Sequence, residues 1–224
     1  MHIYTKEFVD FCVNNLDLKS AFNNNYESLS VCIIDCVYSL RAVYFTTTVP
    51  VVERYADAFM NGNKQASGDT ISKFIDNIEK SGGPIAFADK VLKNNQKIGG
   101  KNAIPKGEVC YQLAKYLKYL NIETIEDFRQ FDCPELLEIV LRAVKGMGDA
   151  GTNYLFMLAG DQTRCKPDVH IHQCIKDACE TDISNDECQE LFTDAVSVLR
   201  GEYPDITVRG LDSVIWNKYQ IVKK

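Results

Sequence analysis

A tight turn separates two helical patterns at Val144-Lys145-Gly146-Met147-Gly148-Asp149. Apolar residues at helical spacing predict one helix over residues 134–144 and another over 149–159. The two glycines permit the positive φ angles of a turn and leave backbone N–H groups uncovered. These N–H groups lie at the start of the second helix, where the helix dipole favours an anion, and Lys145 adds a positive charge. Such a hairpin can hold a phosphate of a DNA backbone without reading a base.

A second interpretation of the same turn is a plain corner between two helices, closed by a glycine C-cap. Asp149 favours this interpretation, because an acid suits a helix N-terminus but repels a nearby phosphate. The turn by itself therefore leaves a structural and a functional role open.

Downstream of the hairpin, the segment Lys166-Pro167-Asp168-Val169-His170 begins another helical pattern. Pro167 ends the preceding loop, and Asp168 is well suited to cap a helix over residues 168–179. Taken alone, this pattern indicates a helix cap. Asp168 becomes a candidate for catalysis through its position relative to the hairpin, 22 residues after Gly146.

Helical spacing extends through nearly the whole chain, and no alternating pattern of strand length occurs, so we expect an all-α fold. Residues 30–44 are strongly apolar and predict a buried helix, although the acid Asp35 is embedded in them. The predicted helices span residues 5–15, 30–44, 50–61, 70–80, 85–93, 107–119, 123–129, 134–144, 149–159, 168–179, 186–200 and 211–221.

The charge balance argues against a general nucleic-acid binder. The sequence has 25 basic and 31 acidic residues, a formal net charge of −6, whereas proteins of that class are usually basic. An acidic protein can still present a local basic face. Residues 90–106 contain lysines and no acid, and they form either such a face or an ordinary solvated surface. The lysines are Lys90, Lys93, Lys97, Lys101 and Lys106.

The nine cysteines are odd in number, and most lie in apolar helical contexts. The N-terminus lacks the pattern of a signal peptide, and no stretch of roughly 18 apolar residues predicts a membrane span. We therefore expect reduced cysteines in a protein that is cytoplasmic (nucleoid-associated) or nuclear, is not secreted and has no membrane partner. Cys32 and Cys36 lie four residues apart without a second pair, so we expect no metal site.

Three landmarks follow one another at suitable spacing: Ser39-Leu40-Arg41-Ala42, the hairpin Val144-Lys145-Gly146-Met147-Gly148, and Pro167-Asp168-Val169-His170-Ile171. In this arrangement, residues 28–178 resemble the helix-hairpin-helix DNA glycosylase superfamily, of the endonuclease III and adenine glycosylase type. The resemblance implies a DNA repair enzyme. Its partner would be double-stranded DNA that contains a lesion or a mismatch.

The resemblance also implies an architecture of two helical lobes with a central cleft. Residues 29–162 would form the central lobe, which contains the hairpin 134–159. Residues 1–28 and 163–224 would together form the second lobe. Asp168 would lie at the mouth of the cleft.

Under this resemblance, Asp168 is the catalytic carboxylate. The target base is first flipped out of the duplex, and breaking its N-glycosidic bond develops positive charge on the sugar, which a nearby anion stabilises. Glycoside hydrolysis uses carboxylates in the same way. His170 is a supporting residue, because it can hydrogen-bond within the turn and help to set Asp168.

The resemblance assigns DNA binding to the hairpin residues Lys145, Gly146 and Gly148. We add Lys97 and Lys101 from the lysine-rich stretch. Arg41 is a candidate to fill the gap that the flipped nucleotide leaves, and the alternative for Arg41 is an ordinary surface arginine.

Two differences from the family limit which of its activities and cofactors we expect here. Bifunctional members carry a lysine two residues after the second glycine, and this position is Ala150 here, so we expect a monofunctional enzyme without lysine-dependent lyase activity. Many members bind an iron–sulfur cluster through four C-terminal cysteines. Only Cys174, Cys179 and Cys188 follow Asp168, so we expect no cluster and no other cofactor.

The acidic charge and the missing lysine also fit two other interpretations. One is a non-catalytic helix-hairpin-helix relative that binds DNA, and the other is a protein-interaction relative that uses the fold without DNA.

Overall fold

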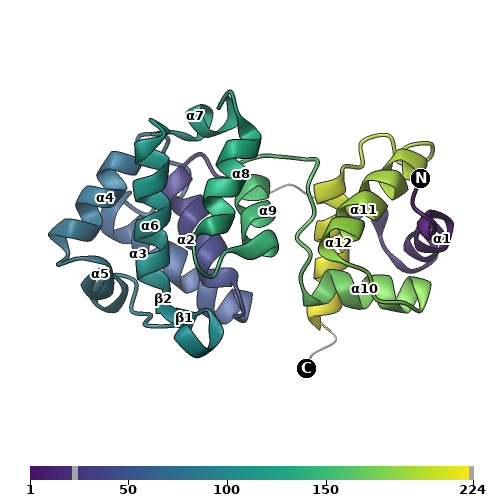
Figure 1. Ribbon diagram of the computed structural model, residues 1–224, viewed down its shortest axis with the longest axis horizontal. Coiled ribbons are helices and arrows are strands. Elements are labelled where there is room, and N and C mark those ends of the chain that lie inside the picture. The colour runs from purple at the N-terminus through teal and green to yellow at the C-terminus, as the bar shows by residue number, and fades with distance from the viewer. Residues whose placement is uncertain (22–24, 222–224) are drawn as a thin grey trace. The chain divides into compact units, whose positions relative to one another are not determined.

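The computed structural model describes residues 1–21 and 25–221 of the 224-residue chain. These residues are predominantly helical, which confirms the all-α prediction (Figure 1). A short antiparallel pair, β1 (Lys97–Ile98) and β2 (Ile104–Pro105), is an addition that the sequence did not predict.

The chain divides into two compact units, and each has its own apolar core. Residues 25–159 form the first, which we call the hairpin unit. Residues 1–24 and 160–224 form the second, which we call the Asp168 unit.

The hairpin unit is built around α2 (Leu29–Ser39), all of whose residues are buried. This helix contacts α3, α6 and α9 (Figure 1). Ser28 caps α2 by accepting a hydrogen bond from the Val31 N–H, and its own hydroxyl donates to Asp69. The other elements of this unit are η2 (Tyr44–Thr48, π-helical), α3 (Val49–Phe59), α4 (Ile71–Lys80), α5 (Pro84–Lys90), η3 (Gly100–Asn102), α6 (Lys106–Tyr119), α7 (Ile125–Arg129), α8 (Pro134–Ala143) and α9 (Gly148–Leu158).

The prediction of one helix over residues 30–44 was wrong at its C-terminal end. The helix stops at Ser39, and Arg41 adopts a left-handed φ of 54°. The ammonium group of Lys106 lies buried at this helix end and donates to the carbonyl oxygens of Tyr38 (3.0 Å) and Leu40 (2.9 Å). Because a buried charged donor satisfies these carbonyls, the chain can leave the helix in the protein interior.

Lys106 is therefore not part of a solvated basic surface. Its side chain is 2% exposed, and it also donates to the amide oxygen of Gln96 at 3.0 Å. The other four lysines of the 90–106 stretch are solvent-exposed.

The acid embedded in α2 is stabilised by three tyrosines. The hydroxyl groups of Tyr26 and Tyr44 donate to Oδ2 of Asp35 at 2.8 and 2.7 Å, and Tyr154 donates to Oδ1 at 3.0 Å. Burial raises the pKa of the Tyr154 phenol, and the nearby Asp35 raises it further. The phenols thus replace the water that a buried carboxylate has lost.

The Asp168 unit contains α1 (Thr5–Asn15), η1 (Leu18–Ser20), α10 (Val169–Cys179), α11 (Asn185–Leu199) and α12 (Val208–Ile221). Helix α10 packs on α12 and α1, and α11 packs on both of these as well. Phe8 and Phe192 meet in its core with their ring centroids 5.3 Å apart. A capping box between Ser184 and Glu187 begins α11.

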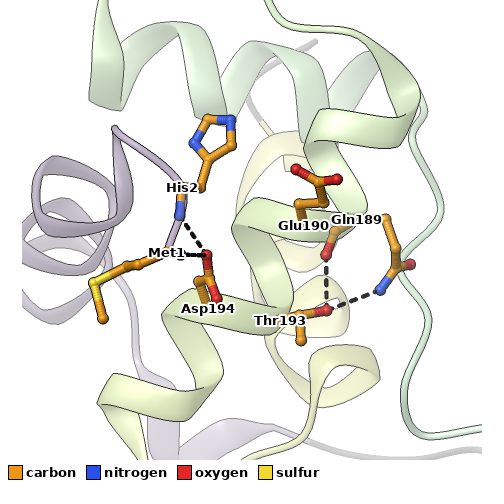
Figure 2. Close-up of a pocket in the computed structure, with 6 residues that line it drawn as sticks. All are labelled: Met1, His2, Gln189, Glu190, Thr193 and Asp194. Atoms are coloured by element: carbon orange, nitrogen blue, oxygen red, sulfur yellow. Dashed lines mark hydrogen bonds and ion pairs between the residues drawn. The ribbon is translucent and has the colours of Figure 1, made fainter.

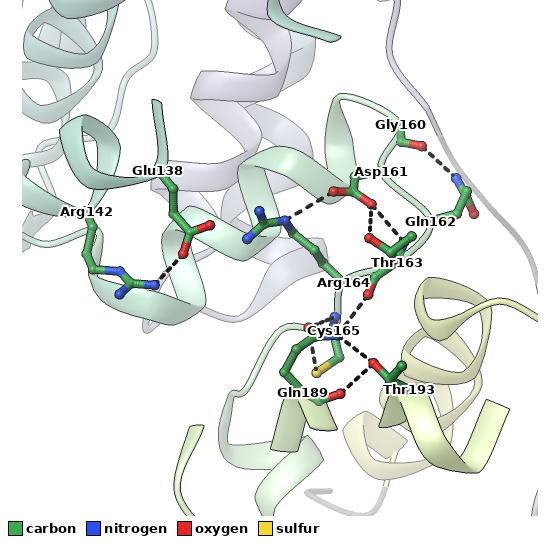
Figure 3. A network of polar contacts seen from close by, with 10 residues as sticks. All are labelled: Glu138, Arg142, Gly160, Asp161, Gln162, Thr163, Arg164, Cys165, Gln189 and Thr193. Carbon is green, nitrogen blue, oxygen red and sulfur yellow. Dashed lines mark hydrogen bonds and ion pairs between the residues drawn. The ribbon is translucent and has the colours of Figure 1, made fainter. Parts of the chain in front are cut away.

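The loop that leads to Asp168 is fastened to α11 (Figure 3). Gln189 donates to the carbonyl oxygen of Thr163 at 2.8 Å and accepts from the Cys165 N–H at 3.1 Å. Asp161 accepts hydrogen bonds from the N–H and hydroxyl groups of Thr163. These contacts fix the approach of the chain to α10.

Seven of the nine cysteines are buried. Within residues 1–21 and 25–221, no helix has both the length and the apolar character needed to span a membrane.

Candidate functional site

The predicted turn lies between α8 and α9 in the hairpin unit. Gly146 and Gly148 have φ angles of 98° and 53°, so both use conformations that side chains rarely adopt. The buried side chains of Val144 and Met147 anchor the turn to the core. The N-cap residue of α9, Met147, makes no side-chain capping hydrogen bond, and a Cβ added to Gly148 would meet no atom of the described residues within 4 Å apart from its chain neighbours and its own helix backbone. The start of α9 is therefore open.

The lysine-rich stretch packs directly on this turn. A Cβ on Gly146 would come within 2.7 Å of Ile98 Cγ2, and one on Gly99 would come within 3.2 Å of Lys145 Cε. The exposed residues Lys97 and Lys101 lie two residues on either side of Gly99. The structure thus brings together five of the six predicted DNA-binding residues of this unit, all except Arg41. We call these five the hairpin surface: Lys97, Lys101, Lys145, Gly146 and Gly148.

Asp149, the acid that argued against an anion site, is paired. Arg142 Nε lies 3.1 Å from Asp149 Oδ1, and Arg142 Nη2 lies 2.6 Å from Glu138 Oε1. Figure 3 shows the Glu138–Arg142 contact. The charge of Asp149 is therefore partly offset by a cation from α8.

Arg41 is exposed at the left-handed turn after α2. The neighbouring side chain of Leu40 packs against Gly151, where an added Cβ would lie 3.2 Å from Leu40 Cδ1. The turn that carries Arg41 therefore rests on the first part of α9, the helix that begins at the hairpin surface.

In the other unit, Asp168 caps α10. Its Oδ1 atom accepts hydrogen bonds from the N–H groups of His170 (2.8 Å) and Ile171 (3.3 Å). Within the part of the chain that the structure describes, no hydrogen bond reaches Oδ2. Asp168 is partly exposed, whereas the preceding residues Lys166 and Pro167 are buried. Hydrogen bonds to one carboxylate oxygen thus fix the side chain in the partly exposed position at the start of α10.

His170 contributes to this arrangement through its backbone N–H. Its ring lies edge-on to Trp216 of α12, with the centroids 6.4 Å apart. Val169, between Asp168 and His170, is 65% exposed, so an apolar side chain faces solvent at the start of α10.

Asp212 is the residue near Asp168 that the sequence analysis missed. It belongs to α12 and is 7% exposed, and its Oδ2 accepts the Lys166 N–H at 2.8 Å. The sequence marked Asp212 as unusual only by its position in an apolar segment, Leu211-Asp212-Ser213-Val214-Ile215-Trp216. That signal does not reveal what the acid contacts.

Burial raises the pKa of Asp212 most, the negative charge of Asp168 raises it as well, and the net pKa is about 7. The Lys166 N–H bond and the charges of Lys166 and Arg209 act in the opposite direction. Lys166 and Arg209 are themselves buried, at 9% and 6% exposure. Two acids and two bases therefore interact where the loop before α10 meets α12.

The Asp168 unit also has a hollow that contains none of the predicted site residues. It is lined by Met1, His2, Gln189, Glu190, Thr193 and Asp194 (Figure 2). The N–H group of His2 donates to Asp194, whose carboxylate also lies 3.7 Å from the terminal amine. Among the described residues, no group of three or more His, Cys, Asp and Glu side chains is arranged to hold a metal ion.

The hairpin surface and the carboxylate site both lie within residues 6–220, which match one protein family, described as Domain of unknown function (DUF8548). The chain belongs to this family. No curated protein and no solved structure matches it.

Proposed function

We propose that this DUF8548 protein is a monofunctional DNA glycosylase of the helix-hairpin-helix type, with Asp168 as its catalytic carboxylate. The observation that carries the proposal is the state of Asp168, whose Oδ1 is fixed by two N–H groups while Oδ2 accepts no hydrogen bond among the described residues.

The proposed reaction is hydrolysis of the bond between C1′ of the sugar and the nitrogen of a damaged or mispaired base. The base is flipped out of the duplex, and Oδ2 of Asp168 stabilises the positive charge that develops on the sugar. The oxygen of a water molecule then bonds to C1′, and the base leaves with the electron pair of the broken bond and gains a proton. Asp168 orients this water and accepts its proton, and the solvent supplies the proton that the departing base gains and later takes up the one held by Asp168.

The hairpin surface supports the DNA part of the proposal. Backbone N–H groups at the open start of α9 bind one phosphate, and Lys97, Lys101 and Lys145 add positive charge around it. Arg41, on the turn that packs against α9, fills the gap left by the flipped nucleotide. Residues 134–159 act as the helix-hairpin-helix motif.

The enzyme uses water and no amine nucleophile. The position that holds a lysine in bifunctional glycosylases is Ala150, and no lysine occurs between Lys145 and Lys166. We therefore propose release of the base without lysine-dependent strand cleavage.

Single-turnover base release from a panel of lesion and mismatch duplexes tests the proposal. Asp168→Asn keeps an oxygen that can cap α10 but removes the charge, and it should slow release roughly 100- to 1,000-fold. Asp182→Asn is the matched control, because it removes a 75% exposed carboxylate of the same unit. Equal rates for Asp168→Asn and the wild type would overturn the role of Asp168. A wild type that releases no base from any duplex would overturn the enzyme activity on that panel.

A second candidate is a non-catalytic DNA-binding relative. The observation that favours it is that the hairpin surface lies in a unit that does not contain Asp168, so it can bind phosphate whether or not the carboxylate acts. This candidate predicts salt-dependent duplex binding that Gly148→Ala weakens, without base release from any duplex. A protein-interaction role would instead give no duplex affinity at low salt.

A further inference from the structure

Asp212 is tied to the backbone of the turn that carries Asp168. Its Oδ2 accepts the Lys166 N–H at 2.8 Å, and the Asp168 N–H donates to the Lys166 carbonyl oxygen at 2.7 Å. Lys166 thus receives a hydrogen bond from Asp168 and gives one to Asp212. The conformation of this turn depends on a carboxylate from α12, which lies more than 40 residues further along the chain.

The Asp212 carboxylate is buried, whereas Asp168 is partly exposed. The charged and titratable groups that interact with Asp212 are Lys166 and Cys165 in the loop, Asp168 at the start of α10 and Arg209 on α12. A protein retains an acid in such a place when the acid has a specific partner, because an unpaired buried charge is costly. Here the partner is the turn that presents Asp168.

We propose that Asp212 is a positioning residue of the Asp168 site, which holds the Lys166–Asp168 turn and sets by its own charge the electrostatic potential at Asp168. Asp212 does not touch the substrate and acts through Asp168. The catalytic part of this inference rests on the proposed glycosylase function.

The pKa of Asp212, about 7, makes this effect dependent on pH in the neutral range. Below this pKa, Asp212 is neutral and adds no negative potential at the Asp168 carboxylate. Above it, Asp212 is ionised and increases the negative potential at the Asp168 carboxylate. This potential favours the positive charge that develops on the sugar, so base release should become faster as the pH rises through about 7.

Carboxyl ¹³C NMR on the full chain tests the electrostatic link without any need for activity. Asp212 should titrate near pH 7 in the wild type and at a lower pH in Asp168→Asn, because the repelling charge of Asp168 is gone. An Asp212 signal that titrates in the ordinary range of a carboxylic acid, or that ignores Asp168→Asn, would overturn the proposal.

Base release measured between about pH 5.5 and 8.5 tests the catalytic part. The wild-type rate should rise about fivefold across this range, and Asp212→Asn should lack the rise. Asp205→Asn, which removes an exposed carboxylate just before α12, is the control and should keep it. A rise that persists in Asp212→Asn would contradict the proposal. A wild type that releases no base, yet shows the NMR link, would overturn the glycosylase function and leave the link between the two acids established.

Hydrogen exchange of the Lys166 amide tests whether Asp212 holds the Lys166–Asp168 turn, independently of the effect of its charge. Asp212→Asn keeps an acceptor oxygen and should leave this amide protected, whereas Asp212→Leu should speed its exchange by about tenfold or more. If Asp212→Leu leaves the exchange rate unchanged while the protein remains folded, Asp212 does not hold the turn.

Discussion

The side chain of Ile98 fills the space beside Gly146, where an added Cβ would lie within 2.7 Å of Ile98 Cγ2. This contact joins the lysine-bearing turn between β1 and β2 to the turn between α8 and α9. The packing of these two turns against each other brings the lysines of the first turn and the glycines of the second into one surface, the hairpin surface.

Gly146→Ala should destabilise the hairpin unit by roughly 2–4 kcal/mol, because it combines a positive φ with a steric clash. Urea unfolding measures this loss. In an Ile98→Ala background the clash is removed, and the same change should cost only about 1–2 kcal/mol. Equal costs in the two backgrounds would show that the Ile98 contact does not restrict position 146.

Gly148→Ala should behave differently, because a Cβ at this position meets no described atom within 4 Å beyond its chain neighbours and its own helix backbone. We expect a loss of stability of about 1–2 kcal/mol from the left-handed φ alone. Duplex binding should weaken more than this loss explains, since the new methyl group occupies the place of the proposed phosphate. Fluorescence anisotropy under conditions in which the variant is fully folded provides the measurement, and unchanged affinity would argue against phosphate binding here.

Lys145→Gln should weaken duplex binding nearly uniformly across sequences. Its slope of log affinity against log salt should fall in magnitude by about 1, as expected for one lost phosphate contact. Lys80→Gln is the control, because Lys80 is a 76% exposed lysine on α4, outside the hairpin surface. Parallel salt slopes for wild type and Lys145→Gln would remove Lys145 from the interface.

Replacements of Asp168 should separate its capping role from its charge. Asp168→Ala loses both N–H contacts and should destabilise the protein by about 1 kcal/mol, whereas Asp168→Asn should stay within about 0.5 kcal/mol of the wild type. Both variants should lose base release. If only the alanine variant lost it, capping rather than charge would explain the requirement.

The stability of the protein should depend on pH through Asp212. Burial raises the pKa of this group from an ordinary 3.8 to about 7, so between these pH values the folded protein holds a proton that the unfolded chain has released. The neutral Asp212 side chain therefore contributes its full stability below pH 3.8, and this contribution is lost as the pH rises towards about 7. Asp212→Asn removes this loss.

The unfolding free energy of Asp212→Asn, relative to the wild type, should therefore increase between about pH 4 and pH 8, by at most roughly 4 kcal/mol. Urea unfolding at several pH values gives the comparison, with Asp205→Asn as the control that should show no such trend. A constant difference between Asp212→Asn and the wild type would mean that the pKa of Asp212 is ordinary.

Lys106→Met should test why α2 ends where it does. The replacement keeps the length of the side chain but leaves the carbonyl oxygens of Tyr38 and Leu40 without their buried donor. We expect a loss of roughly 2–4 kcal/mol and faster amide exchange around Arg41. Lys101→Met, at an exposed position, should change stability by less than about 0.5 kcal/mol.

The sequence by itself determined most helix positions, because helical periodicity and capping are local. The pattern over residues 5–15 matches α1, and the Ser184–Glu187 box that begins α11 involves residues only three apart. The glycines of the hairpin turn and the capping geometry of Asp168 depend on local backbone chemistry in the same way. The DNA-related roles of these residues stay predictions.

The tertiary structure decided what depends on partners distant in sequence. Lys106 sets the end of α2 from more than 60 residues away, Ile98 joins the lysine-bearing turn to Gly146, and Asp212 reaches the Lys166 amide from α12. A sequence pattern marks an acid or a lysine as unusual in an apolar segment. It does not state whether that group meets a donor, a carbonyl or another charge, because the packing of helices determines which groups are buried together.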